Sequence, residues 1–161
     1  MAEAADAAAG AATLRTAADT FAFGARLGSR LRAGDVVVLS GPLGAGKTVL
    51  AKGIGHAMGV EGPITSPTFV LARVHRPRTP ATPAMIHVDL YRLLDAGSTG
   101  GLDVLAELDS LDLDTELDDA VVVVEWGAGL ADRLSERCLE ISLARGNGGD
   151  VRTATWRWSP S

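Results

Sequence analysis

A glycine-rich stretch that ends in lysine and threonine is the part of this chain best suited to chemistry. Its residues Gly41-Pro42-Leu43-Gly44-Ala45-Gly46-Lys47-Thr48 match G-x-x-x-x-G-K-[ST], the pattern of a phosphate-binding P-loop. Glycines let the backbone turn N–H groups towards an anion, and a following helix adds the positive end of its dipole. The lysine supplies a charge for the phosphates, and the threonine hydroxyl is a ligand for Mg²⁺. The predicted nucleotide-binding residues here are Gly41, Leu43, Gly44, Ala45, Gly46, Lys47, Thr48 and Val49.

Two acidic residues each follow an apolar run that is typical of a buried strand. Asp89 ends the run that starts at Ala84, and Glu125 ends the run that starts at Ala120. In an open parallel sheet, ligands bind beyond the carboxyl ends of the strands, which is also the edge where a P-loop lies. Both acids are therefore predicted catalytic residues and, with Thr48, predicted Mg²⁺ ligands. One would hold the metal and the other would orient the attacking water, in an order that the sequence leaves open.

The base of the nucleotide is predicted to be adenine rather than guanine. Guanine-specific P-loop GTPases usually read the base with an Asn-Lys-x-Asp motif, and besides Lys47 the chain has only Lys52, which Gly53 and Ile54 follow. ATP and Mg²⁺ are therefore the expected cofactors. Three functions stay open at this point: an ATPase, a small-molecule kinase of the P-loop class, and a docking module that binds ATP without hydrolysing it.

The elements that must position these residues alternate between helix and strand. Helices are expected over residues 13–31 and 47–58, and residues 35–40 between them form a buried strand. This order indicates an α/β class, a P-loop NTPase-like layered fold with a mostly parallel central sheet flanked by helices and a C-terminal antiparallel hairpin. The other strands are expected over residues 68–72, 84–88 and 120–124, and the hairpin over residues 137–143 and 151–158.

Length and composition favour one soluble domain. The chain has 161 residues, of which 47% are hydrophobic, and no apolar run approaches the ~20 residues of a membrane span. Residues 1–12 are expected to be a disordered, alanine-rich tail without the features of a signal peptide, and residues 13–161 a single domain. The single Cys138 permits no internal disulfide, and a cytoplasmic location is expected. The net charge of −5 argues against strong autonomous binding to nucleic acid.

Three further segments form a pattern together with the P-loop. They are Ser66-Pro67-Thr68-Phe69, His87-Val88-Asp89-Leu90-Tyr91-Arg92-Leu93 and Val124-Glu125-Trp126. In this order, the four motifs resemble the TsaE (YjeE) family of small bacterial P-loop ATPases, and the resemblance covers about residues 13–143. It implies an ATPase required for the threonylcarbamoyladenosine (t6A) modification of tRNA, acting with the transferase TsaD and its partner TsaB and reaching tRNA only through that complex.

The resemblance adds residues to the predicted site by their position. It places Thr68, with Ser66, in a switch-like segment near the γ-phosphate, and it places Trp126 beside the nucleotide. The two acids predicted above match the family's essential acids. Arg92 is consistent either with stabilisation of transition-state charge or with a structural ion pair.

Several other features favour ordinary structural roles. Residues 73–78 are rich in arginine and are expected to form an exposed basic loop. Residues 95–119 match the family poorly, so no partner contact is assigned to them. Pro42 departs from the family pattern, which commonly has an acidic residue there, but the backbone rather than this side chain would cradle a phosphate. The histidines that lack metal-ligand spacing are His56, His75 and His87.

Overall fold

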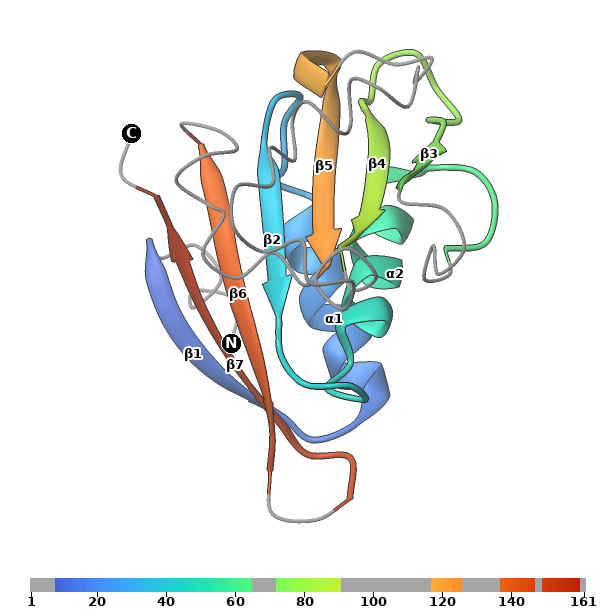
Figure 1. The fold of residues 1–161 in the computed structure, drawn as a ribbon. Helices are drawn as coiled ribbons and strands as arrows, with labels where there is room; N and C mark the ends of the chain where they lie inside the picture. Colours follow the sequence, from blue (N-terminus) through green and yellow to red (C-terminus); the bar gives the residue numbers. More distant parts are fainter. Residues whose placement is uncertain (1–7, 65–71, 91–116, 126–136, 147–148, 160–161) are drawn as a thin grey trace.

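The described part of the chain forms one seven-stranded sheet with two helices packed against it (Figure 1). The computed structural model describes residues 8–64, 72–90, 117–125, 137–146 and 149–159. Among these residues, no helix combines the length and the apolar character needed to cross a membrane. The elements are β1 (Ala9–Leu14), α1 (Ala17–Gly28), β2 (Val36–Ser40), α2 (Lys47–Met58), β3 (Ala72–His75), β4 (Ala84–Asp89), η2 (Leu117–Asp119), β5 (Ala120–Glu125), β6 (Cys138–Arg145) and β7 (Arg152–Trp158).

The sheet is parallel in its centre and antiparallel at both edges. Its strand order is β1-β7-β6-β2-β5-β4-β3, and the pairs β6–β2, β2–β5 and β5–β4 are parallel. The pairs β1–β7, β7–β6 and β4–β3 are antiparallel. The mostly parallel sheet expected from the sequence is therefore a mixed one. The predicted C-terminal antiparallel hairpin is confirmed by the pairing of β6 with β7. A short turn suffices to join two antiparallel neighbours.

Strand β1 corrects the prediction of a disordered tail over residues 1–12. Ala9–Leu14 pairs along its whole length with β7, and Gly10 lies so close to the Trp156 ring that any side chain there would collide with it. This pairing joins strands from opposite ends of the chain, so no local sequence pattern predicts it. Residues 1–7 lie outside the described residues.

Helix α1 begins later than the expected residue 13 because residues up to Leu14 belong to β1. Its start is set by Thr16, whose hydroxyl accepts a hydrogen bond from the Asp19 N–H at 3.1 Å. The Asp19 carboxylate in turn accepts from the Thr16 N–H at 3.2 Å. These reciprocal bonds satisfy N–H groups that the first helical turn leaves without partners.

Strand β3 extends past the end of the strand predicted over residues 68–72. Only Ala72 of the predicted strand over 68–72 falls in it, and residues 68–71 lie outside the described residues. Arg73 and His75, expected in a basic loop, pair with β4 opposite His87 and Met85. An edge strand needs only one partner, so polar residues are tolerated on it and its alternation is weak.

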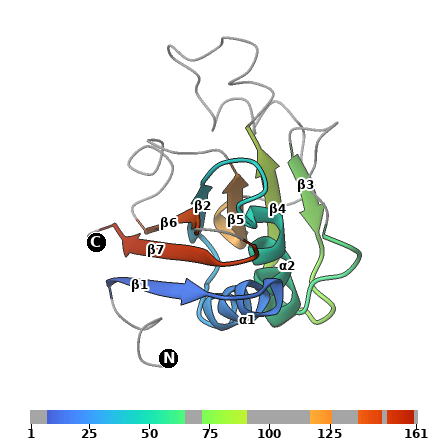
Figure 2. The same cartoon turned by 90° about the horizontal axis from the view of Figure 1, so that it is seen from below.

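The two faces of the sheet bury different sets of residues. Alternate residues such as Val37 and Val123 pack towards α1 and α2, whereas Val38 and Val122 form a second apolar cluster on the other face. Figure 2 shows both described helices on the same side of the sheet. Strands buried on both faces read as continuous apolar runs, which is why β2, β4 and β5 were found from sequence.

Glycines allow α1 and α2 to pack closely. A side chain at Gly24 would collide with the Leu50 carbonyl, and one at Gly53 would collide with the Phe21 carbonyl. Helix α2 spans the residues predicted for it and ends at Gly59, whose φ of 69° is typical of a glycine cap. The close packing fixes α2, whose first residues are Lys47 and Thr48, against α1.

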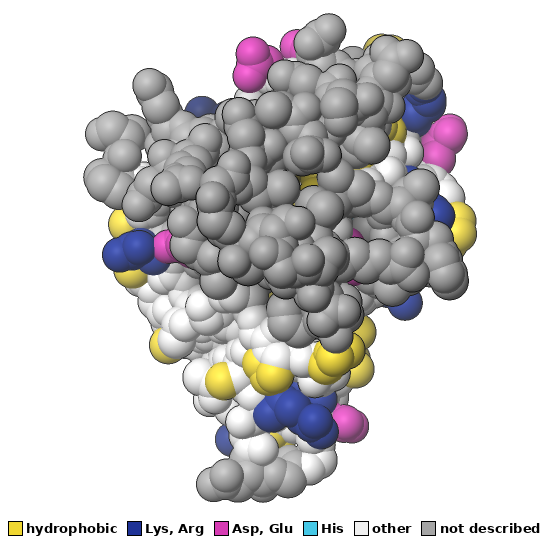
Figure 3. Space-filling model, viewed as in Figure 1, with side chains coloured by type: hydrophobic (Ala, Val, Ile, Leu, Met, Phe, Trp, Pro, Cys, Tyr) yellow, Lys and Arg dark blue, Asp and Glu magenta, His cyan; other side chains and the backbone are white. Residues whose placement is uncertain are grey.

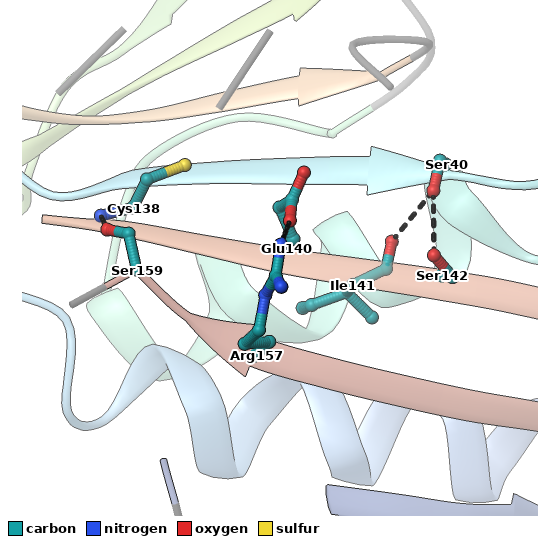
Figure 4. Close-up of polar contacts among 7 residues, drawn as sticks. All are labelled: Ser40, Cys138, Glu140, Ile141, Ser142, Arg157 and Ser159. Atoms are coloured by element: carbon teal, nitrogen blue, oxygen red, sulfur yellow. Dashed lines mark hydrogen bonds and ion pairs between the residues drawn. The ribbon is translucent and has the colours of Figure 1, made fainter. Parts of the chain in front are cut away.

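Strand β6 is joined by side chains both to β2 and to β7 (Figure 4). The Ser40 and Ser142 hydroxyl oxygens lie 3.0 Å apart, and Ser40 also donates to the Ile141 carbonyl at 3.4 Å. On the neighbouring pair, Arg157 donates to the Glu140 carboxylate at 2.9 Å. Since Ser40 is the last residue of β2, these contacts place β6 beside the start of the glycine-rich loop.

Candidate functional site

The loop between β2 and α2 has a backbone that depends on its glycines. Gly41, Gly44 and Gly46 have φ values of 144°, 77° and 101°, a region that other residues rarely adopt. A side chain at Gly41 would also collide with the Leu143 carbonyl of β6. The loop therefore runs against β6 and turns directly into α2, whose first residue is Lys47. Strand, loop and helix occur in the order that the motif predicts.

The Lys47 ammonium lies against the backbone of this loop. Its Nζ donates to the carbonyls of Gly41 at 2.6 Å and Pro42 at 2.9 Å, and the residue is 5% exposed. Burial lowers the pKa of Lys47 below its ordinary value, although the Glu125 and Asp89 carboxylates oppose this shift. A cation held beside a helix N-terminus suits the binding of an anion.

Glu125 is the centre of a buried hydrogen-bonded group that joins three elements. The Thr48 hydroxyl, from the first turn of α2, donates to Glu125 Oε1 at 3.3 Å. His87 Nε2, from β4, lies 2.5 Å from Glu125 Oε2. Both Glu125 and His87 are buried. A hydroxyl and a carboxylate placed together in this way are the oxygen ligands that Mg²⁺ prefers, so these residues fit a metal beside the loop.

Asp89 lies next to Glu125 across the β4–β5 pair. The two residues are direct partners in the register, and the Leu90 N–H donates to the Glu125 carbonyl at 3.1 Å. Asp89 is 8% exposed, and its carboxylate acts electrostatically on Lys47. The structure thus brings four predicted site residues together at the carboxyl ends of the central strands. They are Lys47, Thr48, Asp89 and Glu125.

Some of the other predicted site residues are among the described residues, and others are not. Thr68 and Trp126, together with Ser66 and Arg92, lie outside the described residues. Within the loop, the side chain of Leu43 is 69% exposed, so only its backbone can line a phosphate site. The loop residues Gly41, Gly44, Ala45 and Gly46 stand where the motif predicts, and Val49 follows Thr48 in α2.

Sequence reasoning missed two residues that contact the site. His87 was quoted in the family resemblance and checked for metal-ligand spacing, but it was given no role in the site. It precedes Asp89 by two residues in a strand, so both must face the same side of the sheet. Arg152 donates from β7 to the Gly44 carbonyl at 2.9 Å. No local signal points to this contact, because it depends on where the C-terminal hairpin joins the sheet.

These features define an α/β protein with a candidate nucleotide site at the carboxyl ends of parallel strands. A sequence model of the family described as "Threonylcarbamoyl adenosine biosynthesis protein TsaE" matches residues 14–153, and the chain belongs to this family.

Relatives of known name agree with this membership. The protein of Mycobacterium tuberculosis named "tRNA threonylcarbamoyladenosine biosynthesis protein TsaE" is 69% identical over 152 residues, covering 94% of this chain and 89% of the relative. The protein of the same name from Mycobacterium leprae is 65% identical over 149 residues, covering 92% and 91%. The crystal structure of YdiB from Bacillus subtilis shares the fold, with a TM-score of 0.66 at 22% identity over 92% of this chain and 84% of that one.

Proposed function

We propose that this protein is a Mg²⁺-dependent ATPase of the cytoplasm that is required for the t6A modification of tRNA. The main support for ATPase activity is that Lys47, Thr48 and Glu125 lie together beside a glycine-rich loop that leads into a helix. The part played in tRNA modification rests on family membership and on the names of the relatives.

Each residue of the site has a distinct task in this proposal. The loop N–H groups and the Lys47 ammonium bind the phosphates of ATP. Thr48 and Glu125 hold the Mg²⁺, which supplies neutralisation of phosphate charge when bound. Asp89, the register partner of Glu125 on the neighbouring strand, orients the attacking water. His87 keeps the Glu125 carboxylate turned towards Thr48.

The partners in the proposal are the TsaD and TsaB proteins, with tRNA reached only through them. The chain carries 15 basic and 20 acidic residues, a balance that disfavours strong binding to nucleic acid by this chain alone. We expect the isolated protein to hydrolyse ATP slowly, because phosphoryl transfer by P-loop proteins gains much of its rate from an added arginine.

ATP hydrolysis by the purified protein, with and without TsaB, TsaD and tRNA, tests this function. We expect low activity alone and a clear rise with the partners. Lys47→Ala should abolish nucleotide binding, and Lys52→Ala, which removes an exposed lysine of the same helix, should leave it unchanged.

Two outcomes would favour the alternatives. Transfer of phosphate from ATP to a small metabolite instead of water would indicate a kinase. If Lys47→Ala abolished ATP binding while Glu125→Ala changed no hydrolysis rate, a docking module that uses ATP only as a ligand would be the better description.

A further inference from the structure

Arg152 of β7 contacts the glycine-rich loop although 108 residues separate it from Gly44. Its Nη2 donates to the Gly44 carbonyl at 2.9 Å, and its Nη1 donates to the carbonyls of Gly149 and Val151, each at 3.1 Å. One guanidinium thus bridges the turn of the C-terminal hairpin and the loop between β2 and α2. A planar group with several donors is well suited to such a bridge.

The carbonyl that Arg152 contacts belongs to the peptide that joins Gly44 to Ala45. In a trans peptide, the carbonyl and the next N–H point in opposite directions. With the Gly44 carbonyl turned out to Arg152, the Ala45 N–H is turned into the loop, where it donates to the Pro42 carbonyl at 3.1 Å. Gly44 has no side chain to restrict its own backbone, so an external contact can decide this orientation.

The hairpin that carries Arg152 is firmly attached next to the loop. Arg152 pairs with Arg145 at the last position of the β6–β7 register, and the Gly146 N–H donates to the Val151 carbonyl at 2.8 Å. The contact between Ser40 and Ser142 ties β6 to the end of β2 (Figure 4). Figure 3 shows basic side chains gathered over the lower part of β6 and β7. Arg152 therefore lies on a hairpin whose position beside the loop is fixed by these contacts.

We propose that Arg152 is a positioning residue for phosphate binding: it holds the Gly44–Ala45 peptide so that the Ala45 N–H faces into the loop. This inference rests on the nucleotide binding of the proposed function. Arg152 need not touch the nucleotide, because it acts through the backbone that would bind the phosphates.

Arg145 provides a matched control for charge. It lies opposite Arg152 in the register and has the same formal charge. Its Nη1 is 3.8 Å from the position that a Cβ on Gly44 would take, yet among the described residues no side-chain hydrogen bond joins it to the loop. Removing it should therefore weaken the local positive field without releasing the Gly44 carbonyl.

The test compares the full-length variants Arg152→Gln, Arg152→Lys and Arg145→Gln with the unmodified protein. Hydrogen exchange of the Ala45 amide is measured by NMR without nucleotide, and ADP affinity is measured by calorimetry. We expect Arg152→Gln to speed Ala45 exchange and to weaken ADP binding, each about tenfold, as loss of one charge-assisted hydrogen bond implies. Arg152→Lys should restore part of both effects, and Arg145→Gln should change ADP affinity less than about threefold.

Three results would overturn the inference or part of it. Unchanged Ala45 exchange and ADP affinity in Arg152→Gln would show that the contact positions nothing. Equal losses in Arg145→Gln and Arg152→Gln would show that charge alone matters. If the unmodified protein bound no ADP, the proposed function and the phosphate role would fail together, while Ala45 exchange would still decide whether Arg152 orients the peptide. Should Arg152→Gln not fold, the same two measurements on Arg152→Lys decide the matter.

Discussion

Two buried carboxylates lie at opposite ends of the central strands and have different partners. Asp35, just before β2, is 1% exposed and accepts hydrogen bonds from Arg137 Nε at 2.6 Å and from the Arg32 N–H at 2.8 Å. Glu125, at the end of β5, is 2% exposed and contacts the Thr48 hydroxyl and the His87 imidazole instead.

The difference shows how a structural acid is distinguished from an acid suited to chemistry. The partner of Asp35 is a guanidinium that stays charged at every relevant pH, so its charge is balanced within the fold. The hydrogen-bonding partners of Glu125 do not include a permanent cation among the described residues, and Lys47 acts on it only through the field. A buried acid such as Glu125, with no permanent cation among its hydrogen-bonding partners, is suited to bind a cation from solution. Asp35, which is already paired with a guanidinium, is not.

The largest expected effect is the fall in the rate of ATP hydrolysis that Glu125→Gln causes. Replacing the carboxylate by an amide keeps the size of the side chain but removes the charge that would hold Mg²⁺. We expect ATP hydrolysis with the partner proteins to fall about 10³-fold, within the range typical of such groups, while the protein stays folded. Steady-state phosphate release measures this, with circular dichroism as the control for folding. Hydrolysis within a factor of about two of the unmodified rate would contradict the role given to Glu125.

Asp35→Asn should show the opposite profile. The amide NH₂ replaces an oxygen that faces a donor, so a buried polar group loses its partner and Arg137 loses its ion pair. We expect the free energy of unfolding to fall by about 3 kcal/mol, the lower part of the range for breaking a buried pair, because Arg137 is half exposed. Urea unfolding measures this. The rate of ATP hydrolysis well below the unfolding transition should be unchanged, and a loss of rate comparable to that of Glu125→Gln would break the comparison.

Gly24→Ala serves as a destabilising change without charge. Alanine in a helix normally stabilises relative to glycine, but here the new methyl group would meet the Leu50 carbonyl of α2. We expect a net loss of about 1–2 kcal/mol in the free energy of unfolding, as is typical of overpacking. Ala22→Gly, at an exposed position of the same helix, measures propensity alone. If Gly24→Ala raised stability, the close packing of α1 on α2 would not be as tight as described.

The sequence predicted the centre of this molecule better than its edges. The predicted bounds of α2 are those of the structure, and β2, β4 and β5 agree to within a residue, because strands buried on both faces and a helix after a glycine loop have strong local patterns. β1 and Arg152 were missed because each depends on a partner more than 100 residues away. Asp89 and Glu125 were found by the rule for strand ends, whereas Asp35 was predicted only as the first residue of the strand over 35–40.

His75 gives the smallest expected effect and tests whether the pH dependence of stability arises at a buried histidine of the edge strand β3 rather than at Asp35. It is 4% exposed, and its ring lies 6.5 Å from that of His87. Burial is the main reason that the pKa of His75 lies below its ordinary value; a hydrogen bond with the Glu61 backbone opposes this shift, and electrostatic interaction with His87 and Arg73 adds to it. Below pH 6.5 the unfolded chain therefore binds a proton more readily than the folded protein does, and stability falls as the pH falls.

The slope from one such group is at most about 1.4 kcal/mol per pH unit. We expect His75→Gln to flatten the decline of the free energy of unfolding below this pH, as measured by urea titrations across the range. Asp35→Asn should keep the slope contributed by His75, because β5 and β4 lie between Asp35, beside β2, and His75 on β3. If His75→Gln kept the full slope and Asp35→Asn lost it, the pH response would belong to the structural acid rather than to His75.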